Sequence, residues 1–220
     1  MERIKPINKL RLRDVLKRPD LYGGLADGLV QLPLPGKIKI GLSKFDIPAD
    51  LNQFSENICY GQRLFIVREE ENDIGAILRV MDAYYFPLVT GKKWDDNKAL
   101  LFGRKVLNCT AKELYPVSMH LVTIVSELVE REKKLLSREP SKLEKAAGIE
   151  KLSVFSELTA LDFLRQSMGK TEAEVMLTPY NECLVRFMLA REQNAYNERY
   201  MDLMKIQSDP KSKAKFNDNN

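Results

Sequence analysis

Histidine and cysteine are scarce in this chain of 220 residues, which has one histidine and three cysteines. The cysteines, Cys59, Cys109 and Cys183, are widely spaced and form no Cys-x-x-Cys pair. A zinc site needs about four nitrogen or sulfur ligands at characteristic spacing, which this set does not supply. We therefore expect three reduced thiols, no metal and no cofactor.

Long apolar runs are also absent. No stretch of about 18 apolar residues occurs, and such a length is what a helix needs to cross a bilayer. The first 20 residues are charged throughout and lack the apolar centre of a signal peptide. The sequence thus predicts a protein that stays in the cytoplasm where it is made.

Catalytic motifs are missing as well. The chain has no Gly-x-Ser-x-Gly nucleophile elbow, and the glycine-rich stretch at residues 23–28 lacks the Gly-Lys-Ser/Thr ending of a phosphate loop. The single histidine, His120, falls inside a helical pattern, where we interpret it as a satisfied core or boundary residue. We expect a protein that is not an enzyme.

The net charge of +4 is concentrated at the N-terminus. Residues 1–20 hold seven basic and three acidic side chains, so the remainder is neutral. Residues 1–36 are also rich in proline and glycine, which predicts an extended basic arm lying on its own body or on a neighbouring subunit. Such an arm suits either the phosphates of a nucleic acid or an acidic protein surface.

The strongest helical pattern covers residues 116–136. Val117, Leu121, Ile124, Val125 and Leu128 repeat at helical spacing, and Pro116 suits the first helical position. The apolar stripe is broad enough to face a core. We predict a mainly α protein (α+β with a small N-terminal β element) built as a multi-helix body around this central helix.

The positions of proline, glycine and helix-capping residues divide the sequence into four regions. They are an arm at 1–36, a small β element plus helices including the central helix at 37–136, a C-terminal helical region at 137–206, and a flexible tail at 207–220. Local signals within them predict a strand at Lys37–Ile40, a helix from Asp73 ended by Pro87, a helix capped by Asp95 or Asp96, and a Thr171–Glu174 capping box.

The last helix is expected to begin at Thr178-Pro179 and to run to about Lys205. A polar stretch, residues 191–195, separates its early apolar residues, from Leu184 to Leu189, from the later Tyr196, Tyr200, Leu203 and Met204. A long helix of this kind either leaves the body to meet a partner or packs wholly on its own core.

Two stretches resemble bacteriophage morphogenesis proteins of the tail-assembly-chaperone and head–tail connector type. Residues 59–88 resemble their opening, with a leading strand, an acidic turn and an apolar helix, and residues 161–189 resemble their ending, with a short helix, a one-turn step and a Thr-Pro-capped helix. The resemblance implies a protein without cofactor or catalytic residues that binds other phage proteins, often in rings. The basic arm and the long middle region depart from the small chaperones and favour a stable virion component.

We therefore expect a non-enzymatic phage virion structural or assembly protein (a ring, connector or tail component) that forms homo-oligomers. It would act in the host cytoplasm during assembly. Two alternatives are a tail-assembly chaperone absent from the mature particle and a basic nucleic-acid-binding accessory protein. The candidate partner-binding residues are Arg11, Arg13, Lys17, Leu29, Leu32, Leu34, Tyr196, Tyr200 and Leu203.

Overall fold

The computed structural model describes residues 10–17, 28–29, 31–67, 73–138, 140, 142–146, 148–149, 151 and 155–208. The protein is mainly α with one small two-stranded sheet, as predicted. The elements are α1 (Leu12–Lys17), β1 (Lys37–Ile40), β2 (Ser43–Asp46), α3 (Leu51–Glu56), α4 (Tyr60–Val67), α5 (Asp73–Thr90), α6 (Asp96–Val106), α7 (Ala111–Leu136), α8 (Lys142–Ala146), α9 (Ser156–Met168), α10 (Glu172–Met176) and α11 (Tyr180–Ser208).

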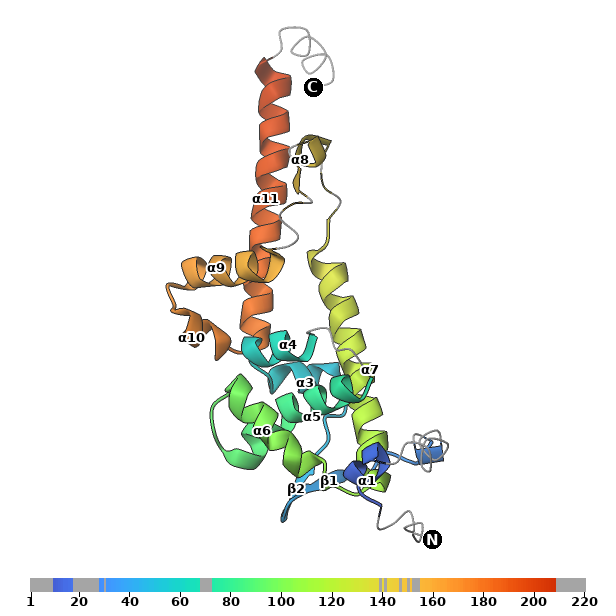
Figure 1. Ribbon diagram of the computed structural model, residues 1–220. Helices are drawn as coiled ribbons and strands as arrows, with labels where there is room; N and C mark the ends of the chain where they lie inside the picture. The colour runs from blue at the N-terminus through green and yellow to red at the C-terminus, as the bar shows by residue number, and fades with distance from the viewer. Residues whose placement is uncertain are drawn as a thin grey trace.

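Two long helices set the shape of the molecule. Both α7 and α11 run from the helical body toward the same end, and α11 continues well beyond the end of α7 (Figure 1). The main core lies in the body, where α3 and α5 pack against α7, and α4 and α6 pack against α5. No helix in the described part of the chain is long and apolar enough to cross a membrane.

The predicted central helix is confirmed, but it begins earlier than expected. Helix α7 starts at Ala111, and Pro116 is buried inside it instead of occupying the first helical position. The apolar stripe that marked this helix in the sequence is buried along Leu121, Ile124 and Leu128. The core therefore forms on the face that the helical spacing indicated.

The predicted strand at Lys37–Ile40 is also confirmed. It pairs antiparallel with β2, and its burial alternates, with Ile38 and Ile40 buried and the two lysines exposed. Gly41 stands in the turn with a φ of 67°, a conformation that side-chain-bearing residues rarely adopt. This hairpin closes one end of the body against α7.

Two expectations for residues 59–90 are wrong. The stretch compared with a leading strand is helix α4, and nearly all of it is buried. Helix α5 does not end at Pro87 but continues to Thr90. Proline removes the N–H that would bond the carbonyl four residues earlier, here that of Ala83. The buried Gln62 side chain donates its amide N–H to that carbonyl over 2.6 Å, so the missing helical bond is replaced from α4.

The arm is partly embedded in its own chain. Leu10, Val15 and Leu29 form a small buried cluster with Ala111, and Leu12 belongs to the main core. The sequence left open whether the arm lies on its own body or on a neighbouring subunit. These four leucine and valine residues lie on their own body. Removing residues 1–36 would expose core side chains, so the arm is not a dispensable extension.

Candidate protein-interaction surface

The base of α11 is fixed by the backbone of α4. The residues before each helix form a short antiparallel bridge between Cys59 and Pro179. The N–H of Tyr60 donates to the carbonyl of Thr178 over 2.9 Å, and the N–H of Tyr180 donates to the carbonyl of Ile58 over 3.0 Å. Because both bonds join segments far apart in the sequence, α11 leaves the body in a defined direction.

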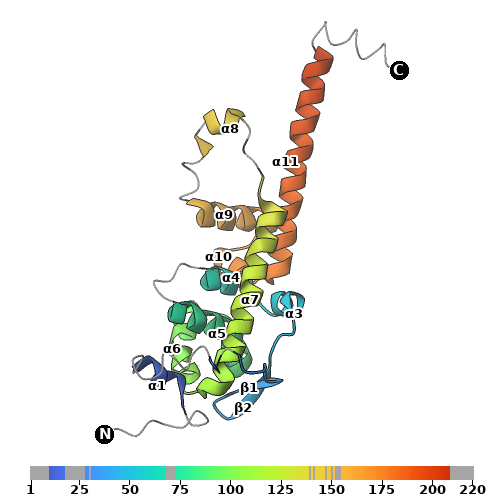
Figure 2. The same cartoon turned by 90° about the vertical axis from the view of Figure 1, so that its right-hand side faces the viewer.

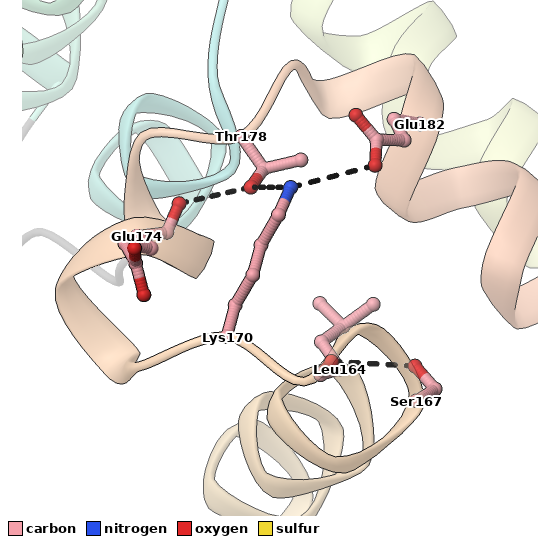
Figure 3. Close-up of polar contacts among 6 residues, drawn as sticks. All are labelled: Leu164, Ser167, Lys170, Glu174, Thr178 and Glu182. Carbon is pink, nitrogen blue, oxygen red and sulfur yellow. Dashed lines mark hydrogen bonds and ion pairs between the residues drawn. The ribbon is translucent and has the colours of Figure 1, made fainter.

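A lysine holds the turn before α11 (Figure 3). Lys170 Nζ lies 3.1 Å from the hydroxyl of Thr178 and 3.5 Å from a carboxylate oxygen of Glu182. The buried Thr178 hydroxyl donates in turn to the carbonyl of Glu174 over 2.9 Å. These contacts join the end of α9, helix α10 and the start of α11. The predicted capping box supports the same turn, since Thr171 and Glu174 cap each other's backbone as expected.

We expect Lys170→Met to destabilise the protein by about 1 kcal/mol, because it removes a charge-assisted hydrogen bond that is partly exposed to solvent. Urea denaturation measures this loss, and Lys112→Met, which removes an exposed lysine from α7, is the matched control. Thr178→Val should add little to Lys170→Met beyond its own bond to Glu174. Fully additive losses for the two substitutions would contradict the contact.

The side of α11 that faces the body carries polar anchors. The Arg191 guanidinium donates to the carbonyl of Leu135 at the end of α7. Arg138, just after α7, bonds Glu198 over 2.7 Å and also pairs with Glu144 of α8. Arg191 and Glu198 thus face the body, on the same side of α11 as the buried Tyr180 and Leu184.

The opposite side of α11 is apolar and exposed. Tyr200 lies nine residues, or two and a half turns, after Arg191, which places it on the far side of the helix. An outer stripe on this side consists of Val185, Leu189, Tyr196, Tyr200 and Leu203, which are 50–61% exposed. Above its base, α11 has α7, α8 and α9 on one side (Figure 2), and the side chains of the outer stripe remain half exposed or more.

The rings of Tyr196 and Tyr200 add shape to the outer stripe. Their centroids are 6.2 Å apart and their planes are inclined by 21°, so the two rings are stacked side by side along the helix. Tyrosine offers a large apolar surface with a polar tip, and it is enriched where proteins meet. A row of exposed apolar side chains on a projecting helix is typical of an interaction site.

A cavity of about 520 Å³ lies between α4, α7, α9 and α11. Its wall contains an ion pair in which Arg63 Nε lies 2.9 Å from a carboxylate oxygen of Glu132. Burial raises the pKa of Tyr60, Tyr180 and Cys183 to about 12. These three side chains are therefore protonated at neutral pH, and none of them is an ionised nucleophile there.

Other candidate chemistry in the described part of the chain has structural partners. No group of three or more histidine, cysteine, aspartate or glutamate residues that could hold a metal occurs among the described residues. His120 Nε2 lies 2.8 Å from the carbonyl of Pro48. Asp95 caps α6 by accepting from the backbone N–H of Lys98 over 3.0 Å, as predicted.

The residues predicted from the sequence to bind partners do not form one surface. Tyr196, Tyr200 and Leu203 lie together on the outer stripe. Leu29 is 2% exposed and covered by its own chain, so its assignment to a partner surface is wrong. The remaining residues lie near the other end of the molecule: Arg11, Arg13 and Leu34 are exposed, Leu32 packs beside Leu29, and Lys17 ends α1 with a side chain outside the described set.

Sequence reasoning missed two members of the outer stripe. Val185 and Leu189 fall in the early, apolar part of α11 and were not among the predicted partner-binding residues, yet they are 61% and 50% exposed. The available signal was the spacing of seven residues that relates Leu189, Tyr196 and Leu203. No protein family, curated protein or solved structure matches this chain.

Proposed function

We propose that this protein is a non-enzymatic structural or assembly protein that binds other protein chains through the outer stripe of α11. The observation that supports this function lies in the upper part of α11, where Arg191 and Glu198 face the body and a row of leucine and tyrosine side chains on the opposite side is exposed. Burying exposed apolar area stabilises an interface by about 25 cal/mol per Å², so such a face gains most when another chain covers it.

The setting we propose is the assembly of a phage particle. The resemblance of residues 161–189 to the ending of phage morphogenesis proteins supports this setting, and this stretch includes the base of α11. In this role the helical body positions α11, and α11 joins the body to neighbouring components of a ring, connector or tail. A chaperone that leaves before maturation would use the same surface transiently.

Introducing glutamine at Leu189, Tyr196 and Leu203 together is expected to abolish binding to the structural proteins encoded by the same genome. These side chains are exposed, so the substitutions should leave the helical content and the free energy of unfolding nearly unchanged. The measurement is co-purification with each co-expressed structural protein, followed by mass spectrometry of purified particles.

Met201→Gln is the matched control for this experiment. Met201 is 56% exposed on α11 but lies off the outer stripe, so it changes an apolar residue to the same polar one elsewhere on the helix. The proposed function predicts normal binding for this control. Unchanged binding by the triple variant would contradict the proposal.

A further inference from the structure

The outer stripe has the spacing of a two-helix seam. Leu189, Tyr196 and Leu203 follow one another at intervals of seven residues. Gln193 and Tyr200 stand between them, so the steps along the row from Leu189 to Leu203 are four, three, four and three residues. Alternating steps of three and four residues keep a row of side chains facing a neighbouring helix. The surface therefore fits a partner that is itself a long helix.

Charged residues flank this seam on one side. Glu192 and Arg199 are both exposed, lie seven residues apart, and are not paired with any other charged side chain in the described part of the chain. In a helix pair, residues in this flanking position meet residues of the neighbouring helix and set its identity and direction. The partner helix must therefore present a positive charge opposite Glu192 and a negative charge opposite Arg199.

We propose that the partner is a second copy of this chain, with its α11 running antiparallel along the outer stripe. In the register that sets Leu189 opposite Tyr200 of the second copy, Gln193 lies opposite Tyr196 of the second copy. The same register brings Glu192 to Arg199 of the second copy, and the two-fold symmetry forms this ion pair twice. The inference rests on the proposed function, because it takes the outer stripe as a protein-binding surface, and it names a second copy as one chain that binds there.

A parallel pair does not fit the same residues. It would set each position against its own equivalent, so Arg186 would face Arg186, and Gln193 would face Gln193. Glu192 would lie near Asn197 and Arg199 near Met204, so neither charge would find an opposite one. The antiparallel register instead sets Arg186 opposite Leu203 and leaves no like charges in contact.

The antiparallel arrangement also suits the shape of the molecule. The overlapping segment, residues 186–203, is about 27 Å long at 1.5 Å per residue. The body lies at the Tyr180 end of α11 (Figure 2), and Arg191, on the side opposite the outer stripe, is the residue that bonds the end of α7. In the antiparallel pair the two bodies therefore lie at opposite ends of the paired helices. The second copy then covers the stacked rings of Tyr196 and Tyr200.

Charge reversal in the full-length protein tests this inference by sedimentation velocity over a range of concentrations at low salt. The wild-type protein is expected to form a dimer of twice the chain mass of 25.3 kDa. Glu192→Arg alone and Arg199→Glu alone should each weaken the dimer roughly tenfold or more, since each sets like charges together at two symmetric places. The double variant, Glu192→Arg with Arg199→Glu, should restore it.

Mixing the two single variants gives the decisive result. A copy with Glu192→Arg meets a copy with Arg199→Glu through two opposite-charge pairs, so the mixture should form dimers more tightly than either variant alone. Asp202→Arg is the control, because Asp202 is an exposed acidic residue of α11 that lies off the seam. Circular dichroism should show the same helical content for all variants.

Three results would overturn the inference: a wild-type protein that stays monomeric, a dimer insensitive to both reversals, or single variants that weaken the dimer and do not rescue each other. These results are separable from a failure of the proposed function. A monomeric wild type whose glutamine triple variant still loses its co-purified proteins refutes the second copy alone. A charge-dependent dimer whose triple variant binds those proteins normally refutes the proposed function alone.

Discussion

Replacing Gln62 with leucine is expected to destabilise the protein by about 2–4 kcal/mol, because one buried and one partly buried backbone group lose their partner at once. The Gln62 side chain is 3% exposed. It donates to the carbonyl of Ala83 over 2.6 Å and accepts from the N–H of Cys59 over 2.8 Å. Leucine has nearly the same volume, so the loss measured by urea denaturation should report the hydrogen bonds and not a cavity.

Pro87 provides a test of this mechanism. The carbonyl of Ala83 needs Gln62 only because Pro87 has no N–H to offer it. Pro87→Ala returns that N–H, so the combination of Pro87→Ala with Gln62→Leu should lose about 1 kcal/mol less than the sum of the two single losses. Gln53→Leu is the matched control: its side chain accepts from the N–H of Ala49 at an exposed site, so its loss should stay below about 1 kcal/mol. Additive losses at positions 62 and 87 would refute the exchange of partners.

The features that the sequence predicted correctly are local ones. The Thr171–Glu174 capping box, the Asp95 cap and the strand at Lys37–Ile40 each depend on residues within a few positions of one another. Helix α5 shows the limit of such signals. Pro87 normally ends a helix, and here a glutamine 25 positions earlier in the chain supplies the bond that the missing N–H of Pro87 leaves open. Nothing in the neighbourhood of Pro87 indicates that distant partner.

Helix α4 shows a second limit. A short, nearly continuous apolar run suits a buried strand or a buried helix equally, because the periodicity that separates them appears only when one face is polar. Residues 60–62 and 64–66 are all buried, so α4 has almost no polar face to reveal its period. The match with a leading strand failed for this reason.

The candidate surface was predictable only in its outer half. The polar stretch at residues 191–195 precedes Tyr196, Tyr200 and Leu203. This position indicates that the three side chains lie too far along the helix to pack on the core. The sequence likewise offered no buried site for Leu29, yet in the structure Leu29 packs in a cluster with Leu10 and Ala111. No pattern in the sequence relates those three positions. The direction in which Val185 and Leu189 point depends on the anchors that turn the other side of α11 inward, above all Arg191 and its bond to the end of α7.

Asp82 is an acidic residue buried between two helices. It lies on α5 and is 4% exposed, and one of its carboxylate oxygens has no hydrogen-bond partner among the described residues. Gly103 of α6 permits this contact, because a Cβ at that position would lie 2.7 Å from the carboxylate. Burial raises the pKa of Asp82 to about 8, so the side chain is mostly a neutral acid at neutral pH.

A raised pKa makes the stability of the protein fall as the pH rises. Below the ordinary pKa of about 4, Asp82 is protonated in both the folded and the unfolded protein. Between about pH 4 and pH 8 the unfolded chain releases the proton and the folded protein keeps it, so the free energy of unfolding decreases by up to about 1.4 kcal/mol per pH unit. Asp82→Asn cannot ionise, so it should become more stable than the wild type as the pH rises through this range.

Urea denaturation at pH 5, 7 and 9 measures the difference between Asp82→Asn and the wild type. Asp95→Asn is the control, because the hydrogen bond from Lys98 lowers the pKa of Asp95, which keeps its carboxylate ionised at all three pH values. The wild type should therefore hold an advantage over Asp95→Asn that is the same at pH 5, 7 and 9, because this stability is lost only as the pH falls through the folded pKa, below the ordinary value of about 4. A difference between Asp82→Asn and the wild type that is constant from pH 5 to pH 9 would show that Asp82 is ionised in the folded protein, and that the space beside Gly103 accommodates a charge.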